Sequence, residues 1–226
     1  MTLKLALADP EDLDNLTEVS CEADFLAATA RLSGSAVLCQ TEPSDGDPAG
    51  RDIDPLGRVT AATDWAEALE MLRRGNQTTY LQGDCWHLAL AFNRLYGLPV
   101  VAVVNHREAG ESGHPHPDER KDTVGHVAVS LPDGRFLDIR GVLDGEESLC
   151  EGTASTPLHS VRPSSPDEIV SILDDYERVF EELGGQAYRP DWNDPSAYPF
   201  AARTEALAKL VFGDAVERLI GANPSP

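Results

Sequence analysis

The chain has 226 residues and carries 39 acidic side chains against 18 basic ones, a formal net charge of -21. This balance argues against a nucleic-acid-binding protein, because contacts to phosphates require clustered Lys and Arg. The longest uninterrupted apolar run, Leu98 to Val104, is far shorter than the roughly 20 residues that cross a bilayer, so no membrane partner is expected. The N-terminus lacks the features of a signal peptide, and a cytoplasmic location is therefore predicted.

The first part of the chain, residues 1–62, is predicted to be a helical segment followed by an acidic linker. Residues 22–32 are typical of a helix that ends before a Ser-Gly pair. Residues 42–57 are dense in Pro, Asp and Gly and offer little to bury, which predicts a loop or linker. A new helix is expected to begin at Thr63 or Asp64 and to end at the Gly-Asn pair after Arg74.

The remaining chain is predicted to contain a core, residues 63–164, and C-terminal helices packed on it, residues 165–226. Hydrophobic periodicity and turn residues place the elements within both parts. In chain order these are a helix (84–96), a strand (99–105), a long polar loop (106–123), two strands (125–131 and 135–140) and two helices (165–183 and 201–220).

Cys85 stands at the predicted start of the first core helix. Asp84 is expected to cap the free amides of the first turn, and Gly97 suits the left-handed residue after the last turn. The positive end of a helix dipole favours a thiolate, and free first-turn amides stabilise an oxyanion. Cys85 is therefore a candidate nucleophile; the competing interpretation is a small apolar residue on an amphipathic face. His87 points elsewhere and is expected at the surface or in a capping role.

The segment after the polar loop is predicted to form a β-hairpin around a Pro-Asp-Gly turn. A three-residue turn with Gly in the left-handed position pairs Leu131 with Arg135. His126 and Asp138 then become diagonal neighbours on one face, roughly 7 to 8 Å apart at the backbone. A two-residue turn would place them on opposite faces.

This register also places His126 opposite Arg140 and Asp138 opposite Ala128. A carboxylate beside a histidine fixes its tautomer and supports the imidazolium form, which a thiolate needs as its partner. The competing interpretation is an ordinary hairpin with one polar face toward solvent.

The order Cys, His, Asp and its surroundings resemble the transglutaminase-like branch of the papain-like cysteine enzymes. The resemblance covers about residues 78–142 and is carried by Gly83-Asp84-Cys85, Gly97-Leu98-Pro99-Val100, Gly125-His126-Val127-Ala128-Val129 and Asp133-Gly134-Arg135-Phe136-Leu137-Asp138. It implies an α+β fold of the papain-like or transglutaminase-like kind. In this fold the nucleophile helix packs on an antiparallel sheet, here with flanking N- and C-terminal helices.

The resemblance also implies roles for individual residues. Cys85 would be the nucleophile, His126 the general base and acid, and Asp138 the group that orients the histidine. Gln82, just before the cysteine, would donate to the oxyanion, and Trp86 is expected to join it in binding the substrate.

The implied function is acyl transfer from an amide through a thioester on Cys85, acting on a protein or peptide or on a small amide, with no cofactor. Hydrolysis by a peptidase, amidase or deamidase is favoured, since nothing in the sequence identifies an amine acceptor. One alternative is a catalytically inactive transglutaminase-like binding module whose acidic surface meets basic partners. A second alternative is a toxin or effector domain that deamidates a Gln or Asn side chain of another protein.

The other cysteines and histidines support no metal site. The four cysteines are far apart and form no Cys-x-x-Cys pair, which predicts neither a zinc site nor a disulfide framework. The loop with His106, His114 and His116 is interpreted as a mobile rim of the cleft, which it would shape together with residues 142–164. Cys150 and His159 receive no role.

Overall fold

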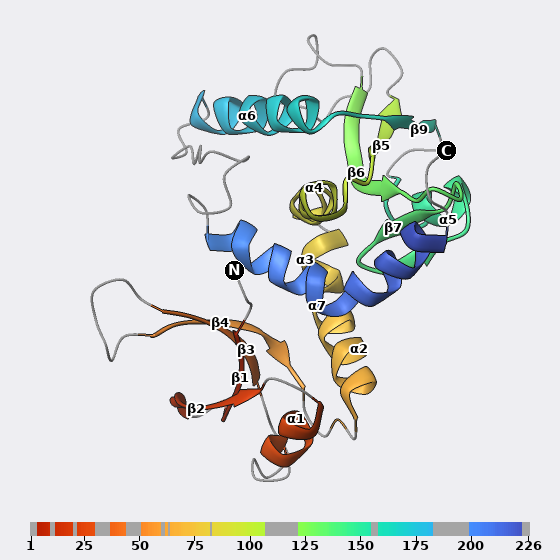
Figure 1. Ribbon diagram of the computed structural model, residues 1–226. Coiled ribbons are helices and arrows are strands. Elements are labelled where there is room, and N and C mark those ends of the chain that lie inside the picture. The colour runs from red at the N-terminus through yellow and green to blue at the C-terminus, as the bar shows by residue number, and fades with distance from the viewer. Residues whose placement is uncertain are drawn as a thin grey trace. The chain divides into compact units, whose positions relative to one another are not determined.

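The computed structural model divides the chain into two compact units, one formed by residues 1–78 with 206–213 and the other by residues 79–205 with 214–226. Figure 1 shows the helices and strands. The structure describes residues 4–9, 12–19, 22–29, 37–43, 51–59, 62, 64–81, 83–106, 122–154, 158–182 and 199–222.

The first unit contains a four-stranded antiparallel sheet in the order β2-β1-β3-β4. Its strands are β1 (Lys4–Asp9), β2 (Asp12–Val19), β3 (Val37–Pro43) and β4 (Arg51–Arg58). The prediction of a helical segment and linker over residues 1–62 is therefore wrong for most of the described residues. Only the helix expected at 22–32 is found, as α1 (Glu22–Thr29).

Strand β4 explains why composition misled the prediction. Its residues include Asp, Pro and Gly, which disfavour strands in general. Among the described strands, β4 pairs with β3 alone, which makes it an edge strand. An edge strand tolerates proline and charge because one row of its backbone groups needs no partner in the sheet. Pro55 faces Cys39 where the register shifts.

Helix α2 (Trp65–Gly75) begins and ends as predicted. The Asp64 side chain accepts a hydrogen bond from the Glu67 backbone N–H at 2.8 Å, which satisfies a free amide of the first turn. On the buried side of α2 lie Ala68 and Leu72.

The second unit is built on a five-stranded antiparallel sheet in the order β8-β7-β6-β5-β9. Its strands are β5 (Val100–His106), β6 (Asp122–Ser130), β7 (Phe136–Asp138), β8 (Gly141–Leu143) and β9 (His159–Pro163). The first six residues of β5 are all buried, so both faces of the sheet are covered here. The predicted strand 135–140 stops at Asp138, because the chain turns there into β8.

Helix α4 (Cys85–Tyr96) packs against β5, β6 and β7 (Figure 1). Every residue from His87 to Phe92 is buried, so the helix is enclosed on more than the single face that its periodicity predicted. It ends as expected at Gly97, whose φ of 67° is the left-handed conformation that glycine adopts without a Cβ penalty.

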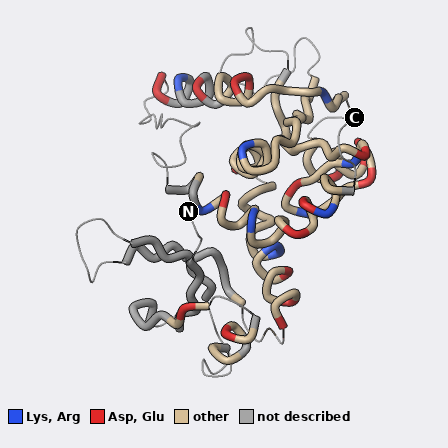
Figure 2. Tube along the Cα trace, viewed as in Figure 1, with Lys and Arg blue, Asp and Glu red and all other residues tan. Residues whose placement is uncertain are grey.

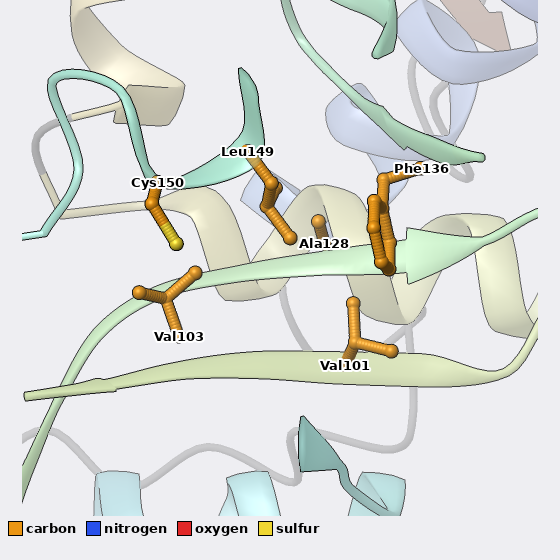
Figure 3. Packing of buried hydrophobic residues seen from close by; sticks show 6 residues of the cluster. All are labelled: Val101, Val103, Ala128, Phe136, Leu149 and Cys150. Carbon is orange, nitrogen blue, oxygen red and sulfur yellow. The ribbon is translucent and has the colours of Figure 1, made fainter. Parts of the chain in front are cut away.

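A hydrophobic cluster joins the sheet to α5 (Glu146–Cys150). Figure 3 shows its members, which come from β5, β6, β7 and α5: Val101, Val103, Ala128, Phe136, Leu149 and Cys150. The cluster holds the end of α5 against the strands that carry the polar residues of the hairpin.

Three further helices complete the described chain: α3 (Gln77–Leu81), α6 (Pro166–Glu182) and α7 (Pro199–Ala222). Both C-terminal helices lie close to their predicted limits. Within the second unit, Tyr80 and Thr204 share a buried hydrogen bond of 2.8 Å, and Arg94 pairs with Glu205 at 2.7 Å.

Acidic side chains are frequent in α2, α5 and α6, whereas β5 contains no charged Lys, Arg, Asp or Glu residue (Figure 2). Among the helices of the described chain, none has the length and apolar character to span a membrane. The second unit, with helices on an antiparallel sheet, confirms the expected α+β class.

Candidate functional site

The hairpin of β6 and β7 has the predicted register. Val129 pairs with Leu137 and Ser130 with Phe136, while the Leu131 N–H donates to the Arg135 carbonyl at 2.7 Å. The turn therefore has three residues, and its glycine has a φ of 85°. This geometry puts residues 126 and 138 on the same face, as the turn sequence predicted.

His126 and Asp138 are joined by a buried hydrogen bond. His126 Nε2 lies 3.0 Å from Asp138 Oδ2, and the exposed fractions of the two residues are 0% and 3%. Because an ionised carboxylate only accepts hydrogen bonds, the Nε2–H donates, which leaves Nδ1 as the second functional atom of the ring. The alternative of an ordinary hairpin with its polar face toward solvent is wrong for this pair.

Cys85 begins α4 and is a free, buried cysteine. The preceding Asp84 occupies the capping position, but its side chain makes no capping hydrogen bond, so the expected cap is not found. Burial raises the pKa of Asp84. The first-turn amides of α4 are thus not blocked by the residue expected to satisfy them.

The Cys85 thiol lies near the His126 ring. Burial alone would lower the pKa of His126, but the hydrogen bond to Asp138 and the neighbouring Cys85 raise it to about 9. Nδ1 of His126 is buried and has no hydrogen-bond partner of good geometry among the described residues. With Nε2 directed at Asp138, Nδ1 is the ring nitrogen that is left for the neighbouring Cys85 thiol.

Asp138 is held ionised by two cationic neighbours. Burial alone would raise the pKa of Asp138, but hydrogen bonds from His126 and Arg140 hold it below its usual value. The guanidinium Nη2 of Arg140 lies 2.6 Å from Asp138 Oδ2. The prediction that Arg140 faces His126 across the ladder is wrong. The strand ends at Asp138, and the following turn directs Arg140 back onto the carboxylate.

His87 is buried with an exposed fraction of 3%, so its expected surface or capping position is wrong. Burial lowers the pKa of His87 to about 3, with Arg94 acting in the same direction. The ring contacts that of Trp86, which is half-buried beside the cysteine. Periodicity placed His87 away from Cys85, but periodicity could not show that its own side of the helix is also covered.

The remaining predicted site residues are only partly described. Gln82 and the loop histidines His114 and His116 lie outside the described residues. His106 contacts the Ser160 hydroxyl at 2.8 Å, joining β5 to β9. Within the described chain, no cluster of three or more His, Cys, Asp or Glu could hold a metal ion.

One feature next to the pair, a bulge at Gly125, was not predicted from the sequence. Gly125 is an extra residue in β6, because Val103 pairs with His126 while Val104 pairs with Val124. A Cβ at Gly125 would lie 2.3 Å from Asn105 Nδ2, so only glycine fits this bulge without displacement. A glycine inside a strand pattern is the signal that could have indicated it.

Comparison with protein-family models, with curated proteins and with solved structures finds no match to this chain.

Proposed function

We propose that the protein is a cysteine-dependent acyl-transfer enzyme that acts on amide bonds through a thioester, with a Cys85-His126-Asp138 triad and a papain-like arrangement of helix and sheet. The observation that carries the proposal is the buried hydrogen bond of 3.0 Å between His126 Nε2 and Asp138 Oδ2, in the same unit as a free, buried cysteine at the first position of α4, a helix that packs on the strand of His126. Burial normally favours a neutral imidazole, and Asp138 and Cys85 act against it by raising the pKa of His126.

The chemistry follows from these positions. The Cys85 thiolate attacks the amide carbonyl carbon, and the C=O electron pair moves onto oxygen, where the first-turn amides of α4 stabilise it. As the C–N bond breaks, the His126 imidazolium donates its Nδ1 proton to the leaving nitrogen. Water then attacks the thioester, losing its proton to Nδ1, and the released acid leaves the thiolate-imidazolium pair restored.

Hydrolysis is the proposed outcome, on a protein, a peptide or a small amide. Loss of a peptide fragment would define a peptidase, and loss of ammonia from a Gln or Asn side chain would define a deamidase.

The test compares two cysteines that are equally buried, Cys85 at 9% and Cys150 at 8% exposure. Limiting iodoacetamide at pH 7, followed by mass spectrometry of each cysteine peptide, measures their separate alkylation rates. Cys85 is expected to react at least about tenfold faster than a free cysteine thiol, since a thiolate is the nucleophile. Cys150 is expected to react slowly, because burial raises its pKa.

Two variants complete this experiment. Cys150→Ala should leave the Cys85 rate unchanged, whereas His126→Gln should remove the excess rate at Cys85. If wild-type Cys85 reacts no faster than a free thiol, the enzymatic proposal fails and the non-catalytic binding module is favoured. Release of amine or ammonia from Gln-containing peptides, lost in Cys85→Ala, then identifies the substrate bond.

A further inference from the structure

Arg140 makes an unusually complete set of contacts with the carboxylate that orients His126. Its backbone N–H donates to Asp138 Oδ1 at 2.7 Å, and its side-chain Nε and Nη2 donate to Oδ2 at 3.0 and 2.6 Å. Oδ2 is the same oxygen that accepts from His126 Nε2 at 3.0 Å. The orientation of the carboxylate toward the histidine is thus defined by the guanidinium.

The guanidinium is itself anchored at the end of α5. Nη1 donates to the Glu151 carbonyl at 2.7 Å, and Nη2 donates to the Leu149 carbonyl at 3.0 Å. The Thr153 hydroxyl also donates to the Leu149 carbonyl, at 2.7 Å. These bonds tie Asp138 to a turn that the hydrophobic cluster holds against the sheet.

The same turn touches the backbone that precedes His126. The Thr153 carbonyl oxygen lies 2.9 Å from the position that a Cβ on Gly125 would take. One turn, residues 149–153, therefore holds Asp138 through Arg140 and also lies close to Gly125, which precedes His126.

The hairpin contains an internal reference for this arrangement. Asp133 and Arg135 repeat the Asp-x-Arg spacing, with a backbone bond of 3.2 Å and side-chain bonds of 2.9 and 2.6 Å. That pair is exposed and faces no histidine or α5 carbonyl in the described chain, so its removal costs little. The Asp-x-Arg spacing therefore explains the bonds between arginine and aspartate, but it does not explain the bonds of Arg140 to the carbonyls of Leu149 and Glu151.

We propose that Arg140 is a positioning residue of the triad, which holds the Asp138 carboxylate ionised and directed at His126 by bracing it against the carbonyls at the end of α5. This inference rests on the proposed function. Lysine cannot replace arginine here, because a compact ammonium does not reach one carboxylate and two carbonyls with a rigid fork.

The charged groups around His126 and Asp138 determine the pKa of His126, which is the quantity that the experiment measures. Asp138 and Cys85 act on His126, while His126 and Arg140 act on Asp138. On the α5 side, Glu146 and Arg140 act on Cys150, and the β5 residue paired with His126 is the apolar Val103. The pKa of His126 thus reports on the placement of the carboxylate.

The experiment compares the full-length variants Arg140→Met, Arg140→Lys and Arg135→Met with wild type. The His126 imidazole signal, assigned by its loss in His126→Gln, is titrated by NMR at a temperature where each variant is folded. Cys85 alkylation is measured at pH 6. Arg140→Met is expected to lower the pKa of His126 and to slow alkylation about tenfold for each unit of that shift. Arg140→Lys should give a smaller change in the same direction, and Arg135→Met none.

The outcomes separate this inference from the proposed function. If wild-type Cys85 reacts no faster than a free thiol, the proposed enzymatic function is wrong. If it is reactive but His126 titrates in both Arg140 variants as in wild type, or at a higher pKa, Arg140 does not position the carboxylate. A higher pKa would mean that the guanidinium only competes with the imidazole for Asp138.

Discussion

Two histidines, both almost fully buried, have opposite charge preferences in this protein. His87 on α4 has a pKa lowered to about 3, and His126 on β6 has a pKa raised to about 9. Their exposed fractions, 3% and 0%, are nearly equal, so burial does not explain the difference. The neighbouring groups explain it: the positive Arg94 lowers the pKa of His87 further, whereas Asp138 and Cys85 raise the pKa of His126.

The comparison teaches how the proposed catalytic histidine is distinguished from a core histidine. A buried imidazole stays neutral unless a neighbour supplies negative charge. The position of His126 beside a free cysteine and an ionised carboxylate is therefore the informative feature, and its burial alone is not.

The largest effect is expected from Asp138→Asn, which should make His126 resemble His87. Without the carboxylate charge, burial is opposed only by Cys85, and the pKa of His126 is expected to fall from about 9. Cys85 alkylation at pH 6 should slow on the order of 100-fold, since each pKa unit that His126 loses weakens its ion pair with the Cys85 thiolate tenfold. Asp133→Asn, in the exposed turn, is the control. An unchanged His126 titration in Asp138→Asn would contradict the comparison.

Gly125→Ala should disturb the placement of His126 and destabilise the fold. The new Cβ would meet Asn105 Nδ2 at 2.3 Å and the Thr153 carbonyl at 2.9 Å, which requires backbone movement. A loss of about 2 kcal/mol in the free energy of unfolding is expected from urea denaturation. Gly75→Ala, where a Cβ meets nothing within 4 Å, should change it by less than about 0.5 kcal/mol. Equal stabilities of the two variants would refute the steric argument.

The two histidines should make the free energy of unfolding depend on pH in opposite directions. His126 contributes stability that is complete below its ordinary pKa of 6.5 and is lost as pH rises toward about 9, because the folded state then holds the extra proton. His87 contributes the reverse: its stability is complete above 6.5 and is lost as pH falls toward about 3.

Melting temperatures at pH 5, 6.5 and 8.5 test these opposite dependences. His126→Gln should reduce the fall in melting temperature between pH 6.5 and 8.5 by a few degrees. His87→Gln should reduce the fall in melting temperature between pH 6.5 and 5 by a similar amount. If His126→Gln instead changes only the acid side, the assigned charge of His126 is wrong.

The smallest effect is expected for His87→Gln on the reactivity of Cys85. His87 points away from the thiol along the helix, so the alkylation rate should stay within about twofold of wild type. A loss comparable to that of His126→Gln would show that the wrong histidine has been paired with the cysteine.

Much of the second unit was predictable because its signals are local. The turn at Pro132 and Gly134 determines the hairpin register, and Gly97 determines where α4 ends. The sheet of the first unit was missed because β1 pairs with the distant β3, and because edge strand β4 has a composition that otherwise suggests a linker.

The sequence by itself indicated which residues share a face of the hairpin, because alternation with a three-residue turn gives one register, and the structure has that turn. It also determined that Cys85 begins a helix. Tertiary structure alone decided the charges: whether a buried histidine is neutral or cationic depends on groups brought from other elements, here Cys85 from α4 and Asp138 from β7. It also decided that Arg140 serves Asp138, since the carbonyls that hold the guanidinium come from the end of α5.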